Sequence, residues 1–217
     1  DSAVKKYEQK FNGRKTSQLR VSEKEIKEAL SKISSEERLA LVSMNGDCGF
    51  QAGSLMNDLT TLAKKKWRND DPPSCDLKRL FVPIPSVGCY IPGGQARYPS
   101  SVFMSVLIAG NAGVKRRVVV SPPDRDGKID PLTIAAAKMC GATEIYKVGG
   151  AQAIGALAYG TKSIPKVDKI VGPGGKFVSI AKSLVSDQVA IDMVAGPTEL
   201  GIMADTSSDP ELVALDL

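Results

Sequence analysis

Apolar positions in residues 1–66 recur at the spacing of amphipathic helices. Ser22 and Glu25 form a capping box, the pattern that begins a helix. Ser35 is the predicted cap of the next helix, and the turn signal Asn45-Gly46 separates it from a third helix over residues 52–66. The expected buried positions of these helices are Ile26, Leu30, Ile33, Leu39, Leu41, Val42, Met44, Leu55, Leu59 and Leu62. The pattern predicts a helical N-terminal region.

From Ser86 onward the pattern changes to short apolar segments, rich in β-branched residues, that alternate with helical segments. Predicted strands cover residues 87–91, 117–121, 144–148, 168–171, 188–194 and 200–204. Predicted helices cover residues 99–111, 131–140, 151–159 and 176–185, the second of them capped by Asp130. A proline-rich linker at residues 69–74 precedes this part. Successive strand–helix units predict an α/β fold with a doubly wound parallel sheet of the Rossmann type.

Glycine-rich turns follow several of the predicted strands, at residues 92–94, 149–150, 172–175 and 195–197. The turns at 149–150 and 172–175 each precede a helix, whose first N–H groups and positive dipole end suit a phosphate or pyrophosphate. The carboxyl ends of parallel strands share one edge, so these turns are expected to line one crevice with Gln152 at its mouth. For either turn alone, the alternative is a tight strand-to-helix connection without a ligand.

Composition narrows the class of protein. Aromatic residues make up only 5% of the 217 residues, which favours helices packed closely on a parallel sheet. The charged start of the chain has no features of a secretory signal and no apolar run reaches the length of a membrane span, so we predict a cytoplasmic protein without a membrane partner. The scattered cysteines are predicted to be free thiols, with Cys89 and Cys140 buried. They are Cys48, Cys75, Cys89 and Cys140.

Candidate chemistry is limited by the absence of histidine, which excludes imidazole catalysis and histidine–metal sites for this chain acting alone. The formal net charge is +5, and the basic run from Lys64 to Arg68 contains Trp67. Because Asp70 and Asp71 follow at once, we interpret the run as a solvated helix face and predict no nucleic-acid partner. Asp192 and Glu199 are candidate catalytic carboxylates, but a structural hydrogen bond at a strand end is the favoured interpretation.

A series of motifs in fixed order resembles one known family. The motifs are GCYIPGG at residues 88–94, YPSS at 98–101, VGGAQAIGALAYGT at 148–161, IPKVDKIVGPG at 164–174, AIDM at 190–193 and AGPTEL at 195–200. Together they resemble the histidinol dehydrogenases, the enzymes of the last steps of histidine biosynthesis, continuously from about Val87 to Leu217. The whole series is far more specific than any single motif.

The resemblance implies an NAD-dependent, zinc-containing homodimer that oxidises L-histidinol through L-histidinal to L-histidine. By the resemblance, Tyr90 and Gln152 contact NAD. A third NAD contact of the family, an asparagine, falls on Gly175, and the serine that contacts substrate falls on Thr198. Gly175 therefore lacks a side-chain contact, whereas Thr198 keeps the hydroxyl.

The resemblance also implies a division of the chain: residues 1–86 form the helical part of an incomplete first domain, residues 87–197 an NAD-binding domain, and residues 198–217 the return into the first domain. The family's zinc ligands and its Glu-His acid–base pair are expected beyond Leu217, so no catalytic or metal-ligating residue is assigned within this chain. We expect the isolated chain to be inactive. The alternative is a non-catalytic nucleotide-binding or dimerisation module derived from the same family.

Overall fold

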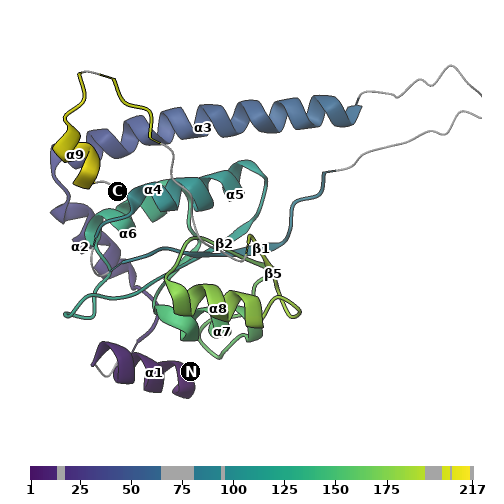
Figure 1. Cartoon of the computed structure of the whole chain (residues 1–217). Helices are drawn as coiled ribbons and strands as arrows, with labels where there is room; N and C mark the ends of the chain where they lie inside the picture. The colour runs from purple at the N-terminus through teal and green to yellow at the C-terminus, as the bar shows by residue number, and fades with distance from the viewer. Residues whose placement is uncertain (14–17, 65–80, 94–95, 194–201, 206, 216–217) are drawn as a thin grey trace, which may run out of the picture.

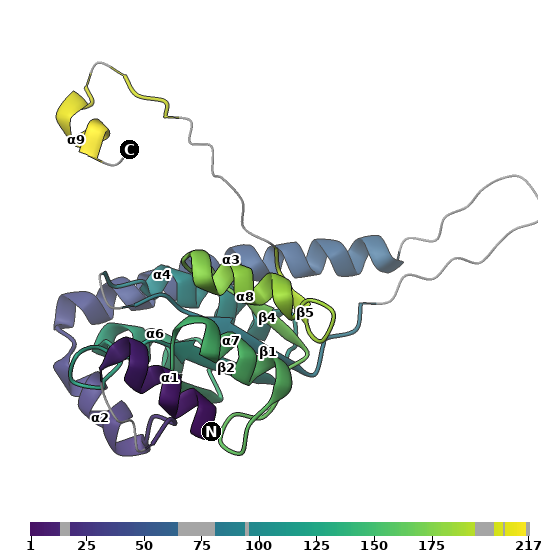
Figure 2. The ribbon, with the colours of Figure 1, turned by 60° about the horizontal axis from the view of Figure 1, so that its bottom comes forward.

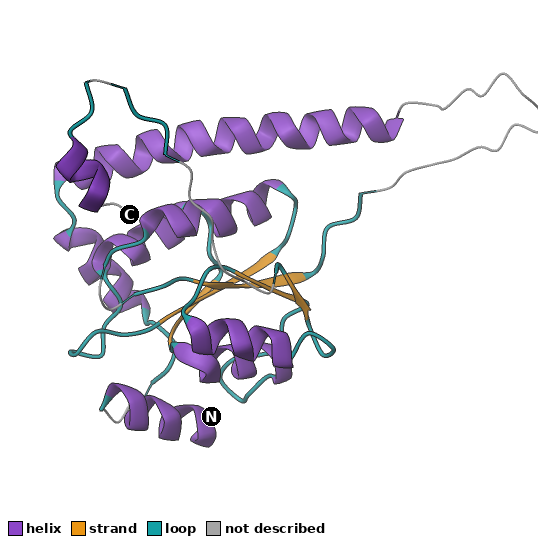
Figure 3. Ribbon diagram, in the orientation of Figure 1, coloured by secondary structure: helices purple, strands orange, loops and turns teal. Residues whose placement is uncertain are grey.

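A parallel sheet lies between two layers of helices in the computed structural model, which describes residues 1–13, 18–64, 81–93, 96–193, 202–205 and 207–215 (Figure 1). Figure 3 shows the strands at the centre and helices above and below them. The elements are α1 (Ser2–Asn12), α2 (Glu23–Lys32), α3 (Ser35–Lys64), β1 (Ser86–Tyr90), α4 (Pro99–Val102), η1 (Phe103–Leu107), α5 (Ile108–Asn111), β2 (Arg116–Ser121), α6 (Pro131–Met139), β3 (Glu144–Lys147), α7 (Gly150–Tyr159), β4 (Lys169–Val171), α8 (Lys176–Leu184), β5 (Ala190–Ile191) and α9 (Pro210–Leu215).

The described strands form one sheet in the order β3-β2-β1-β4-β5, and every neighbouring pair is parallel. The chain builds outward from β1 to β3, then crosses back to the other side of β1 and builds outward again through β4 and β5. The order of strands therefore reverses between β1 and β4, the place where open α/β sheets bind their ligands. The predicted Rossmann-type parallel sheet is confirmed.

Both faces of the sheet are covered, so alternate residues of each strand enter different cores. Cys89, Val119 and Ile145 point into the core shared with α2, α3, the continuous segment α4–η1–α5 and α6. Their neighbours Tyr90 and Val120 point into the opposite core, which is shared with α1, α7 and α8. Figure 2 shows α1 beside α7 on that face, and the two helices are in contact. Segments far apart in the sequence thus meet below the sheet.

The predicted helical N-terminal region is confirmed, but the predicted break between two helices at Asn45-Gly46 is wrong. α3 runs without a break through Asn45-Gly46, where a turn was predicted. Its cap is Ser34 rather than Ser35, because the Glu37 N–H donates to Ser34 Oγ at 3.0 Å. A glycine inside a helix costs only about 1 kcal/mol, which the packing of α3 against η1 and α5 outweighs.

The buried face of α3 also differs from the predicted one. Leu41, Met44, Cys48 and Ala52 follow helical spacing and face the core, whereas Leu39, Val42 and Leu55 are exposed. The side chains of Leu59 and Leu62 lie outside the described residues. The buried face of α3 begins at Leu41 rather than at Leu39. This shift of two residues rotates the buried face about half a turn around the helix axis from the predicted one.

The C-terminal part contains less strand than predicted. β5 covers Ala190–Ile191 instead of residues 188–194, and residues 202–205 form no strand. The linker at 69–74, the basic residues 65–68 and the turn at 195–197 lie outside the described residues. The domain boundaries after residues 86 and 197 stay predictions. Among the described helices, none is long and apolar enough to cross a membrane.

Candidate functional site

Tyr90, the last residue of β1, contacts both glycine turns at the point where the strand order reverses. Its hydroxyl oxygen accepts a hydrogen bond from the N–H of Gly150 at 3.1 Å. Its carbonyl oxygen lies so close to Gly172 that a Cβ on that glycine would be 2.1 Å away. The turns at 149–150 and 172–175 therefore meet at one edge of the sheet, around Tyr90, as expected from the sequence.

The environment of Tyr90 keeps its hydroxyl protonated at neutral pH. The side chain is buried, and burial together with the nearby Glu8 carboxylate raises the pKa of Tyr90 above its ordinary value of 10.0. In the described part of the chain no residue accepts a hydrogen bond from this hydroxyl. The Tyr90 hydroxyl is therefore neutral and can donate a hydrogen bond to a bound ligand.

Gln152 stands in the first turn of α7, where the sequence predicted it. Its Nε2 donates to Oε1 of Glu8 at 2.7 Å, and the same oxygen accepts the N–H of Gly149 at 3.0 Å. Glu8 belongs to α1 and is only 1% exposed. Sequence reasoning missed Glu8, although one signal was present: it follows Val4 by four residues and so places a carboxylate on the buried face of α1.

Backbone N–H groups at the start of α7 already have hydrogen-bond acceptors within the chain. The N–H of Gly149 donates to the carboxylate of Glu8, and the N–H of Gly150 donates to the hydroxyl of Tyr90. Gly149 is needed for packing, since a Cβ there would lie 2.4 Å from Pro122 Cβ. These contacts leave less room for a phosphate at the first glycine turn than the sequence suggested.

The second glycine turn is more open. Gly175 precedes α8 as its N-terminal cap, and no side chain caps the helix there. An added Cβ on Gly175 would meet no atom within 4 Å, whereas one on Gly174 would lie 2.3 Å from Val178 Cγ1. Gly175 therefore has room for a side chain such as the asparagine of the resembling family. Thr198 lies outside the described residues.

A large apolar hollow of about 1050 Å³ adjoins the second turn. Its lining includes Gly172, Gly174, Lys182 and Asp192. Most of the other lining residues are apolar, among them Met56, Phe81, Val82, Pro83, Ile84, Met104, Ile108, Ala109 and Val114. A hollow of this size with a few polar groups in a mainly apolar lining is typical of a small-molecule site.

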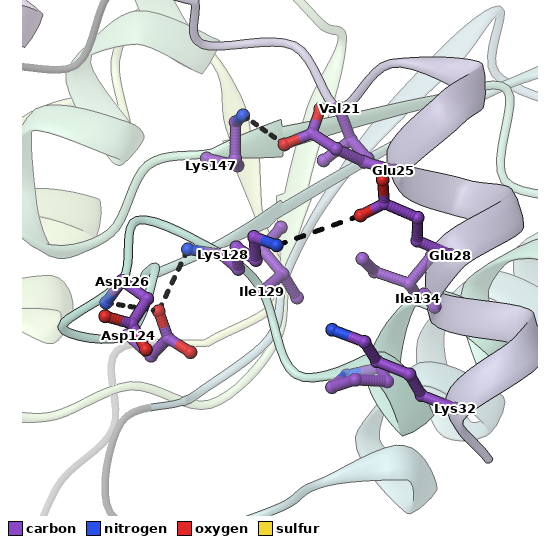
Figure 4. A pocket seen from close by; sticks show the side chains of 12 residues that line it. Val21, Glu25, Glu28, Lys32, Asp124, Asp126, Lys128, Ile129, Ile134 and Lys147 are labelled. Atoms are coloured by element: carbon purple, nitrogen blue, oxygen red, sulfur yellow. Dashed lines mark hydrogen bonds and ion pairs between the residues drawn. The ribbon is translucent and has the colours of Figure 1, made fainter.

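A second hollow of about 270 Å³ lies between α2, the loop before α6 and the end of β3 (Figure 4). Its charged side chains pair with one another: Lys147 Nζ lies 2.6 Å from Glu25 Oε1, and Lys128 Nζ lies 3.7 Å from Glu28 Oε2. Burial would raise the pKa of Glu25, but the hydrogen bonds from Lys147 and Ser22 outweigh it and hold the pKa below 4.5. We interpret the Glu25–Lys147 ion pair beside this hollow as a contact that holds α2 against β3.

A metal site needs a group of His, Cys, Asp or Glu side chains that lie close together. In the residues that the structure describes, no three His, Cys, Asp or Glu side chains lie close enough together to hold a metal ion. The described residues therefore do not form a zinc site, and none of them is assigned as a ligand.

Comparisons with known proteins agree with the resemblance. The family model for histidinol dehydrogenase matches residues 1–217. The chain is 44% identical over 219 residues to histidinol dehydrogenase of Methanosarcina barkeri and 44% identical over 218 residues to that of Geobacillus kaustophilus, covering 49% and 50% of their lengths. The crystal structure of histidinol dehydrogenase from Elizabethkingia anophelis superposes with a TM-score of 0.86 at 37% identity, covering 100% of this chain and 48% of that one. The chain spans about half the length of these relatives.

Proposed function

Because the chain belongs to the histidinol dehydrogenase family, we propose that it carries the NAD-binding part of an oxidoreductase that converts L-histidinol through L-histidinal to L-histidine. The observation that carries this proposal is the contact of Tyr90 with both glycine turns where the strand order reverses. A dinucleotide in an open α/β sheet lies across that point.

The residues at this edge offer the kinds of contact that a dinucleotide uses. Tyr90 supplies a hydroxyl donor and Gln152 a carboxamide, and both are neutral groups suited to ribose or amide partners. The uncapped start of α8 after Gly175 presents backbone N–H groups and a positive dipole end to a diphosphate. When bound, NAD would supply the hydride acceptor; the chain's residues bind and orient it. Thr198 is the proposed substrate contact.

Turnover needs a base for the hydroxyl proton of the alcohol, and the family's zinc-bound chemistry needs imidazole ligands. The chain has no histidine. We therefore propose that the chain alone does not oxidise L-histidinol, and that it acts within a homodimer of longer chains. Formation of NADH by the purified chain, free of host enzyme, would contradict the first part.

Calorimetric titration of the purified chain with NAD tests the cofactor proposal. We expect binding that Gln152→Ala weakens roughly tenfold, the effect of about 1.4 kcal/mol of lost hydrogen bonding. Gln188→Ala is the matched control, because it removes a carboxamide from an exposed position outside the crevice. A folded chain that does not bind NAD, or a Gln152→Ala variant equal to the control, would refute the proposal and favour a module without nucleotide binding.

A further inference from the structure

We propose that Glu8 of α1 is a positioning residue for the cofactor: it holds the carboxamide of Gln152 in one orientation and so leaves its oxygen as the acceptor for a donor group of the nucleotide. This inference rests on the proposed binding of NAD. The contact joins residues 144 positions apart, at a distance of 2.7 Å.

The orientation of the carboxamide follows from chemistry. A carboxylate only accepts hydrogen bonds, so the side of Gln152 that faces Glu8 must be the NH₂ group. The oxygen Oε1 then lies on the Gly150 side, 3.0 Å from the position that a Cβ of Gly150 would take. No residue in the described part of the chain donates to this oxygen. A ligand donor, such as a ribose hydroxyl or an amide NH₂, is the partner it fits.

Glu8 also affects which part of a dinucleotide can lie at the first turn. Its side chain is buried and accepts the Gly149 N–H at the start of α7. A phosphate at that spot would find the N–H groups of Gly149 and Gly150 already in use. The diphosphate is therefore directed toward the second turn, where the start of α8 is open.

A double-mutant cycle on NAD affinity tests whether Glu8 acts through Gln152. The chains are the parent, Glu8→Ala, Gln152→Ala and the double variant. We expect Glu8→Ala to weaken NAD binding roughly fivefold to tenfold in the parent, as for a lost hydrogen bond to a charged group, and less than about twofold when Gln152 is already alanine. Equal losses in both backgrounds would overturn the positioning role.

Two further variants separate positioning from simple loss of folding. In Glu8→Gln the new amide oxygen can still accept the hydrogen bonds from Gln152 and Gly149, so NAD affinity should stay within about threefold of the parent. Val4→Ala loosens the packing of α1 without touching the carboxylate, so it should lower the stability and leave the affinity unchanged. A loss of affinity in Val4→Ala as large as in Glu8→Ala would assign the effect to α1 packing and overturn the proposal.

The free protein gives a readout that separates the two proposals. In NMR spectra, the side-chain NH₂ signals of Gln152 should move toward those of a solvated glutamine in Glu8→Ala and stay in place in Glu8→Gln. If the signals move and Gln152→Ala still binds NAD like the parent, the cofactor assignment of Gln152 fails. If Gln152→Ala weakens binding but the signals do not respond to Glu8→Ala, the positioning role alone fails.

Discussion

The ion pair between Lys182 and Asp192 encloses the backbone of the second glycine turn. Lys182 Nζ donates to the carbonyl oxygen of Gly172 at 3.1 Å, and Asp192 Oδ2 accepts the N–H of the same glycine at 2.8 Å. Lys182 is buried, so an ion pair with Asp192 compensates for the hydration that its ammonium group has lost. The pair fixes the turn from both sides, which agrees with the structural interpretation of Asp192 from the sequence.

Asp192→Asn should destabilise the chain by about 1–3 kcal/mol, because it leaves the ammonium group of Lys182 without its countercharge. Unfolding in urea at pH 7 measures the change. Asp187→Asn is the control, since Asp187 is exposed and its carboxylate accepts a hydrogen bond from the neighbouring Gln188. A loss no larger than that of the control would mean that the pair does not hold the turn.

Gly175→Asn should tighten NAD binding by roughly threefold to tenfold, the effect of one added hydrogen bond, without loss of stability. The backbone of Gly175 has φ −67°, which any residue adopts, and the space around its missing Cβ is open. Calorimetry and thermal unfolding measure the two quantities.

Gly174→Asn is the contrasting variant. Its Cβ would clash with Val178, which is buried against the sheet, so we expect a loss of stability at this neighbouring position. If Gly175→Asn lost stability as Gly174→Asn does, the described geometry of the turn would be wrong.

The Glu25–Lys147 contact should make the chain sensitive to acid. The pKa of Glu25 lies below 4.5 in the folded state, so its stabilising effect is present above pH 4.5 and is lost as the pH falls through the folded pKa. Glu25→Gln should therefore destabilise the chain at pH 7, and this loss of stability should shrink as the pH falls through the folded pKa of Glu25. Urea unfolding of the parent and the variant over a series of decreasing pH values measures the difference in stability.

Glu28→Gln provides the control for that series. Glu28 lies one helical turn from Glu25 and pairs with Lys128 at 3.7 Å, with both side chains about half exposed. Such surface pairs contribute less than about 1 kcal/mol. A pH-independent loss in Glu25→Gln would show that the loss comes from packing rather than from the ion pair.

The sequence predicted the features that depend on neighbouring residues. The capping box of Ser22 and Glu25 is present, and Asp130 accepts the N–H of Thr133 at 2.9 Å at the start of α6. The strands of the sheet were found because buried parallel strands are continuous apolar segments. The family resemblance supplied Tyr90 and Gln152, which lie at one edge.

Features that depend on distant contacts could not be predicted. The turn signal Asn45-Gly46 is overridden by packing of α3 on helices about 60 residues later in the chain. The role of Glu8 depends on a contact with Gln152, and no local pattern records which buried partner a helical carboxylate will meet. Helix and turn propensities depend on neighbours in the sequence. The continuous helix through Asn45-Gly46 and the Glu8–Gln152 contact depend instead on residues that are distant in the sequence and close in space.

Thiol chemistry checks the core that the sheet shares with α3, η1 and α6. Cys89 and Cys140 are buried, and burial raises the pKa of each thiol to about 12. Because only the thiolate reacts, each should react roughly 3000-fold more slowly than an ordinary thiol of pKa about 8.5. In a Cys75→Ser variant, an aromatic disulfide reagent should therefore label Cys48 first, and the two buried thiols only after unfolding in urea. Rapid labelling of Cys89 in the folded chain, identified by mass spectrometry, would show that the face of β1 beneath η1 is open to solvent.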